Sequence, residues 1–191
     1  MCRRLKKLRA TLSNTPIRSM QCSNIILGID PGLTGGLALY NGSSILEMST
    51  MPILKEKRNG KLKSEIDLKE LNKLIVKFKS HNPKCFLEKV GAMPGQGVSS
   101  MFAFGKGFGI LIGMLSAHEI ETTLVSPQRW TALIHKPYAH TSLESKEKSK
   151  LISSKLFPSE NFLATNKSKV PHAGLVDAAL IAVYGYKTLF T

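Results

Sequence analysis

The sequence predicts a mixed α/β protein in which helices cover a five-stranded central sheet. Three strand-like segments separated by turn signals come first, a pattern typical of an antiparallel meander. Helical patterns then alternate with two short apolar strands, and the chain ends in helices. The 191 residues are 42% hydrophobic and contain neither an internal repeat nor a long linker, so we expect one packed domain over residues 24–191.

The first strand and its turn lie in the segment NIILGIDPGLTGGLALY, residues 24–40. An apolar, β-branched run predicts a buried strand that ends at Asp30. Pro31-Gly32 predicts a turn, and Gly35-Gly36 allows the return as a second strand, Leu37–Tyr40. A carboxylate at the end of a core strand needs a cation, a hydrogen-bond donor or a metal ion, because an unpaired buried charge is costly. The alternative is an aspartate that only caps the Pro-Gly turn.

The next elements follow from turn signals and periodicity. They are a strand at Ser44–Thr50, a charged loop at Lys55–Lys63, a helix at Ile66–Lys79 and a strand at Cys85–Val90 that contains Glu88. The helix is assigned because its apolar residues recur at spacings of three and four.

A glycine-rich segment, Gly91–Leu115, comes next, with a helix predicted from Val98 onwards. The side chains expected on its apolar side are Met101, Phe102, Phe108, Leu111, Ile112 and Leu115. Each helical glycine lowers intrinsic helicity by up to about 1 kcal/mol. We therefore expect these glycines where the helix packs closely on a sheet or another helix; they are Gly105, Gly107, Gly109 and Gly113.

The last third is predicted to be mostly helical. Its elements are a strand at Glu121–Ser126, a short helix from Pro127 that contains Trp130, a polar connection at His135–Leu143, a basic helix at Glu144–Leu156, a basic loop at Asn161–Pro171 and a final helix at His172–Leu189 with Asp177 in its first half.

The chain carries a net charge of +14 at pH 7 and has a pI of about 9.8. This excess indicates a polyanionic partner, either nucleic acid or an anionic membrane surface. No continuous apolar run approaches the roughly 20 residues that a membrane-spanning helix needs, so no membrane partner is expected. Three cysteines without metal-ligand spacing indicate a reducing compartment without structural disulfides; they are Cys2, Cys22 and Cys85.

Residues 1–23 differ from the rest in containing six Lys and Arg, five Ser and Thr and no acid. This basic, hydroxyl-rich composition resembles an organellar transit peptide. A disordered basic arm, or an upstream start codon with Met20 as the true start, would give the same composition. The segment has no long apolar region, so secretion is not expected, and the protein is placed in a bacterial cytoplasm or nucleoid or in an organellar nucleoid.

Three acids in otherwise apolar surroundings form the candidate catalytic set: Asp30, Glu88 and Asp177. They come from distant segments, so only the fold can bring them together. Clustered carboxylates repel one another unless cations neutralise them, and hard oxygen ligands suit Mg²⁺. Two such ions about 3.5–4 Å apart promote hydrolysis of a phosphodiester. Each acid taken alone is more often structural.

Four segments follow one another along the chain: GIDPGLTGGLALY, FLEKV, MPGQGVSSMFAFGKGFG and HAGLVDAALIAVYG. Together, in this order, they resemble RuvC-type Holliday junction resolvases, in the phage, bacterial and chloroplast branch, over about residues 25–185. The first motif alone is weak, because actin-like kinases begin similarly. The resemblance implies an RNase H-like fold, a homodimer, and nicking of four-way DNA junctions with Mg²⁺, for which Mn²⁺ can substitute.

The resemblance also implies roles for individual residues. Asp30, Glu88 and Asp177 match the family's metal ligands. The family has a fourth ligand, Asp or His, shortly before the last acid. In this chain the candidate is His172, five residues before Asp177. Bacterial members usually place this ligand three residues before the last acid, where this chain has Gly174. A helix-start histidine without metal is the alternative. Lys146 matches the lysine of a K-x-x-S-K/R element and would contact the scissile phosphate, unless it belongs only to a solvated basic helix face.

Two further expectations concern the glycine-rich segment. Bacterial members often have a junction-wedging aromatic after the strand acid, whereas this chain has Gly91, so Met93 or Phe102 is the candidate wedge. Dimerisation is expected through residues 91–115.

Other function classes remain open. Another RNase H-like nuclease acting on RNA or branched DNA would use the same acids, and a junction-binding protein with vestigial acids would need no catalysis. A sugar-kinase or actin-like ATPase would require two such domains, for which 191 residues are too few.

Overall fold

The computed structural model describes residues 24–191 apart from residues 59, 90, 92–94 and 96. The predicted basic extension over residues 1–23, with Cys2 and Cys22, lies outside the described residues, as does Met93. Cys85 is buried and free.

The central sheet has five strands in the order β3-β2-β1-β6-β7. The strands are β1 (Ile26–Asp30), β2 (Gly36–Tyr40), β3 (Ile45–Thr50), β6 (Lys84–Glu88) and β7 (Thr122–Val125). The first three form the expected antiparallel meander, and β6 and β7 extend it on the other side of β1 as parallel strands. The mixed five-stranded sheet predicted from the sequence is confirmed.

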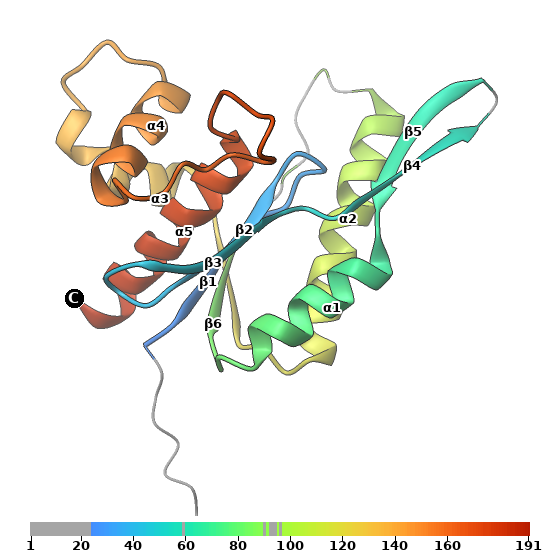
Figure 1. The fold of residues 1–191 in the computed structure, drawn as a ribbon, viewed down its shortest axis with the longest axis horizontal. Coiled ribbons are helices and arrows are strands. Elements are labelled where there is room, and N and C mark those ends of the chain that lie inside the picture. Colours follow the sequence, from blue (N-terminus) through green and yellow to red (C-terminus); the bar gives the residue numbers. More distant parts are fainter. Residues whose placement is uncertain (1–23, 59, 90, 92–94, 96) are drawn as a thin grey trace, which may run out of the picture.

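Helices cover both faces of the sheet (Figure 1). One face carries α1 (Leu68–Lys79) and α2 (Val98–Ala117), and the other carries α3 (Pro127–Ile134), α4 (Ser145–Leu156) and α5 (Ala173–Phe190), with a short 3-10 turn at Lys136–Tyr138. The basic loop predicted at Asn161–Pro171 has no regular element, as expected.

Two hydrophobic cores result from the alternation of side chains along β1. Leu27 and Ile29 belong to the core under α1 and α2, whereas Ile26 belongs to the core under α5. Gly28 shares the α5 side, where a Cβ atom would lie only 2.1 Å from the backbone oxygen of Ala178. Only glycine permits this approach, so α5 lies directly on β1.

The predicted charged loop at Lys55–Lys63 is wrong. The chain there forms a second, two-stranded sheet from β4 (Ile53–Arg58) and β5 (Lys61–Ile66), an antiparallel hairpin that projects beside α2 (Figure 1). Gly60, between the strands, has a φ of 74°, as a tight hairpin turn requires. The high charge of the segment concealed its strands, because both belong to a two-stranded sheet with mostly exposed side chains.

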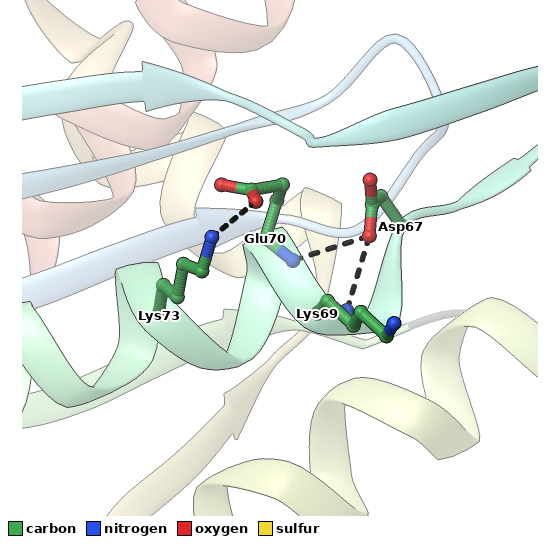
Figure 2. A network of polar contacts seen from close by, with 4 residues as sticks. All are labelled: Asp67, Lys69, Glu70 and Lys73. Atoms are coloured by element: carbon green, nitrogen blue, oxygen red, sulfur yellow. Dashed lines mark hydrogen bonds and ion pairs between the residues drawn. The ribbon is translucent and has the colours of Figure 1, made fainter.

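The helix predicted from Ile66 begins two residues later, because Ile66 ends β5 and Asp67 caps α1. The Asp67 carboxylate accepts hydrogen bonds from the backbone N–H groups of Lys69 and Glu70 at 3.0 and 3.1 Å, and the Glu70 side chain pairs with Lys73 at 2.7 Å (Figure 2). These contacts satisfy two of the backbone donors left free at the start of a helix.

The expected close packing at the glycines of α2 occurs at one position only. A Cβ atom at Gly107 would lie 3.2 Å from Ile66, whereas the space beside Gly105, Gly109 and Gly113 is open. The predicted apolar side of α2 is confirmed at Leu111 and Leu115, which are buried, and at Phe108, which packs on the core. It is wrong for Phe102 and Ile112, which are 76% and 39% exposed. The helix therefore presents a second apolar face to its surroundings.

Among the described residues, α2 and α5 are long and apolar enough to cross a membrane by length and composition. Glycine, serine and Lys106 interrupt the apolar residues of α2, so its continuous apolar runs stay short, but its mean hydropathy over the whole helix is that of a spanning helix. In α5 the apolar character is explained by burial on the sheet.

Candidate active site

The register of the parallel strands brings the first two acids together. Ile29 of β1 pairs with Leu87 of β6, so one further residue places Asp30 beside Glu88. Both residues share the α5 side of the sheet, because they continue the alternation of Ile26 and Phe86, which belong to the core under α5. The two carboxyls therefore lie at the carboxyl ends of neighbouring parallel strands.

Close backbone contact brings the third acid to the same place. Asp177 lies on α5 between Gly174 and Ala178. A Cβ atom at Gly174 would lie 2.3 Å from the backbone oxygen of Thr34 in the turn after β1, and Ala178 touches Gly28 as described above. Asp177 is thus held over the end of β1 by contacts on both sides of it.

The three carboxyls perturb one another electrostatically. Burial and, to a smaller extent, the charges of Glu88 and Asp177 together raise the pKa of Asp30 to about 7. Burial and the charge of Glu88 together raise the pKa of Asp177 to about 6, against the lowering effects of a hydrogen bond from Ser149 and the charge of Lys146. The pKa of Glu88 is raised by burial as well. The cluster therefore resists full ionisation unless a cation joins it.

Asp30 also caps the Pro-Gly turn, which was the alternative interpretation of this aspartate. The backbone N–H of Gly32 donates a hydrogen bond to it and lowers its pKa against the stronger effect of burial. The aspartate caps the Pro-Gly turn and faces the other two acids at the same time. Turn capping is therefore no argument against a role in a charged site.

Lys146 lies on the first turn of α4, and its charge lowers the pKa of Asp177 against the larger effect of burial. The ammonium group is therefore close enough to the cluster to act on charge that develops there. The side chain is exposed, so it remains accessible to a phosphate.

Two residues that the sequence analysis left without a role complete the surroundings of the acids. The indole N–H of Trp130, on α3, donates to Glu88 at 2.7 Å, and the hydroxyl of Ser149, on α4, hydrogen-bonds Asp177. The signals were present in the sequence: a buried tryptophan needs a partner for its N–H, and Ser149 is the serine of the K-x-x-S-K element.

His172 is the N-cap residue of α5, and its ring nitrogen Nδ1 is buried without a hydrogen-bond partner. Such an orphaned nitrogen is costly in a folded protein and is suited to a metal or a water molecule. No contact between His172 and the three carboxyls is seen, so its role as fourth ligand stays a prediction.

The donor set fits a hard divalent cation in its chemistry. Three carboxyls converge with raised pKa values and one buried imidazole nitrogen is free, which suits Mg²⁺ or Mn²⁺. Within the described part of the chain, however, no three His, Cys, Asp or Glu side chains are arranged closely enough to hold an ion as they stand. Binding therefore requires side-chain rotation toward a common centre.

The raised pKa of Asp30 predicts how metal-free stability depends on pH. The folded state retains this proton up to about pH 7, whereas the unfolded chain releases it near the ordinary aspartate pKa of 3.8, so stability falls as pH rises between these values. We expect Asp30→Asn, which stays neutral and keeps an oxygen for Gly32, to raise the Tm at pH 8 in a chelator by about 2–8 °C. Below pH 4 the two proteins should unfold at similar temperatures.

Thermal unfolding across this pH range tests that prediction, with Glu121→Gln as the control because Glu121 belongs to an exposed surface pair. An unchanged Tm for Asp30→Asn at pH 8, or an equal gain at pH 4, would mean that Asp30 carries no unfavourable buried charge.

No protein-family model matches this chain, and no curated protein matches it in sequence. Its structure is similar to that of T. thermophilus RuvC in complex with a Holliday junction substrate, with a TM-score of 0.55 and 14% identity over 86% of this chain and 94% of that chain. Another Thermus thermophilus RuvC structure has a TM-score of 0.49 and 14% identity, over 86% of this chain and 96% of that chain. Fowlpox virus resolvase in complex with its substrate Holliday junction DNA has a TM-score of 0.38 and 13% identity, over 87% of this chain and 99% of that chain. The first likeness confirms the RNase H-like, RuvC-type fold.

Proposed function

We propose that this protein is a divalent-metal-dependent endonuclease that resolves four-way DNA junctions. The observation that carries the proposal is the convergence of Asp30, Glu88 and Asp177, from β1, β6 and α5, at one end of the sheet. The likeness to a RuvC structure that contains a Holliday junction supports the choice of substrate.

Different residues would have different roles in phosphodiester hydrolysis. Asp30, Glu88 and Asp177 would hold two Mg²⁺ ions, with His172 as an additional ligand, and the ions would activate water and stabilise the leaving oxygen. The charge of Lys146 lowers the pKa of Asp177, and this ammonium would balance charge that develops on the phosphate. Because the acids share raised pKa values, their ionisation and the binding of cations are coupled, and metal affinity should increase as pH rises toward 7.

The helices on this side of the sheet carry the positive charge that DNA binding needs. Exposed lysines lie on α4, the helix whose Lys146 acts on Asp177, and on the loop before α5; they are Lys146, Lys150, Lys155, Lys167 and Lys169. Contacts of this kind to phosphates would provide affinity without reading sequence.

The proposal is tested by comparing substrates of equal length. Purified protein and Mg²⁺ are incubated with a synthetic four-way junction, a DNA flap, an RNA/DNA hybrid and a linear duplex. We expect the junction to be cleaved at least tenfold faster than the others. Preferred cleavage of the hybrid or the flap would favour another RNase H-like nuclease, and tight junction binding without cleavage would favour a binding protein.

We further propose a homodimer formed through the open face of α2. Gly105, Gly109 and Gly113 recur every four residues on the side opposite the buried Leu111 and Leu115, and the space beside each of these glycines is open. A second copy of the helix can approach such a face closely, and exposed apolar side chains beside it, Phe102 and Ile112, would be buried by that contact. A two-fold dimer would present two sites to symmetry-related strands of a junction.

Gly109→Leu is expected to weaken the dimer at least tenfold, because the added side chain would hold two helices apart while meeting nothing within the protomer. Ala103→Leu, at an exposed position about a third of a turn around the same helix, is the matched control and should leave the dimer intact. Light scattering and sedimentation measure both. A wild-type protein that stays monomeric, both free and on DNA, would defeat the dimer, and partition into lipid vesicles instead would assign this face to a membrane.

A further inference from the structure

Two of the three acids receive a hydrogen bond from the helices that pack beside the site, one acid from α3 and the other from α4. Trp130 of α3 donates to Glu88 at 2.7 Å, and Ser149 of α4 hydrogen-bonds Asp177. Both side chains are almost fully buried, at 4% and 3% exposure. A partner so enclosed has few alternative rotamers, so it restricts the orientation of the carboxyl that it touches.

A histidine joins the two partners to each other. Nε2 of His135 lies 3.1 Å from Oγ of Ser149, and its ring packs edge-on against Trp130 with the ring centroids 5.8 Å apart and the planes at 78°. His135 is the C-cap residue of α3. The side chains therefore form a continuous path from Glu88 through Trp130, His135 and Ser149 to Asp177.

The direction of the hydrogen bonds in this path follows from the number of protons available. A serine hydroxyl has one proton and a carboxylate can only accept a hydrogen bond, so Ser149 donates to the Asp177 carboxylate. Its oxygen must then accept from His135, which places the ring proton on Nε2. Burial and the charge of Lys148 lower the pKa of His135, which favours this neutral ring.

We infer that Trp130, Ser149 and His135 are positioning residues that hold Glu88 and Asp177 in the orientation for binding divalent cations. The inference rests on the proposed function only in taking these acids as metal ligands. Bonds of this kind around a metal site set the orientation of its ligands, and their loss costs typically 10–100-fold in metal affinity or activity. A purely structural role for the three side chains would leave metal affinity unchanged once the fold is intact.

The chain offers a spectroscopic readout that needs no DNA. Trp130 is its only tryptophan, and its N–H touches a proposed ligand, so its emission should change when Mn²⁺ or Mg²⁺ reaches Glu88. Titration of the DNA-free protein with each ion gives the apparent Kd from fluorescence and, independently, from calorimetry. Glu88→Gln should abolish both signals.

Matched pairs of variants separate positioning from folding. Ser149→Ala removes the hydroxyl and is expected to weaken Mn²⁺ binding about 10–100-fold, whereas Ser149→Thr retains the hydroxyl and should restore it to within about threefold. His135→Phe keeps a ring against Trp130 but removes the donor, and His135→Gln supplies an amide N–H in its place. Trp130→Phe keeps the buried ring without the N–H and is followed by calorimetry alone.

The expected result is weak binding for Ser149→Ala, His135→Phe and Trp130→Phe, with an unfolding temperature in chelator close to that of the wild type, and recovery in Ser149→Thr and His135→Gln. Wild-type Kd values in the folded Ser149→Ala and Trp130→Phe variants would overturn the inference, as would a wild-type chain that binds neither ion. If the wild type binds Mn²⁺ and the variants bind it more weakly as expected, but the wild type cuts no junction, the proposed function is refuted and the positioning role of the three side chains is retained.

Discussion

Asp30→Asn, Glu88→Gln and Asp177→Asn are each expected to abolish junction cleavage and to leave junction binding within about twofold of the wild type. Each change removes one charge from the cluster and so removes a ligand for the cations on which the chemistry depends. We expect the single-turnover rate to fall by at least about 10³-fold. Binding is retained because it depends on Lys and Arg contacts to phosphates, which these changes do not touch.

Gel-shift affinity and single-turnover cleavage, measured on the same junction, check this prediction. Glu121→Gln serves as the control, since Glu121 is exposed in a surface pair with Lys84 and lies at the opposite end of the sheet from the acids. Full cleavage by one of the three variants would remove that residue from the site.

Lys146→Ala is expected to lower the saturated cleavage rate by roughly 10²–10³-fold, the range seen when one preorganised electrostatic donor is lost. The ammonium lies near Asp177, as its effect on the pKa of that acid shows against the larger effect of burial. Affinity for the junction should change little, because one phosphate contact among many contributes modestly.

Lys150→Ala is the matched control for this effect. Lys150 is exposed one turn further along α4, and its loss should weaken binding modestly and reduce the salt dependence by about one phosphate contact, with the saturated rate unchanged. Lys148 is less suitable, because its charge acts on His135. An unchanged saturated rate for Lys146→Ala would reduce Lys146 to a member of a solvated basic face.

The sequence predicted the sheet and the elements that carry the three acids, because both depend on local signals in buried elements. The apolar run before Asp30, the apolar strand containing Glu88 and the long apolar helix containing Asp177 each have unmistakable periodicity or composition. Their spatial meeting follows from the parallel pairing of β1 with β6 and from the glycines that admit α5.

The predictions that were wrong or missing concern segments whose surroundings in the fold cannot be inferred from the local sequence pattern. The β4–β5 hairpin is charged on both sides because little covers it, so it showed no alternation of apolar and polar residues. The second apolar face of α2 is indistinguishable from a core face in sequence, since periodicity does not say what lies opposite. Trp130 and Ser149 reach the acids only through tertiary packing, so their partners were not readable from spacing.

The most direct test of the account is a strand-resolved cleavage assay on an immobile four-way junction, with each strand labelled in turn and the reaction started by Mg²⁺. We predict paired nicks at symmetry-related positions on two opposing strands, dependent on the metal and absent from Asp177→Asn. Cleavage that persists in a chelator or in Asp177→Asn, or a wild-type protein that leaves all four strands intact in Mg²⁺, would contradict the assignment of these acids to a junction-resolving centre.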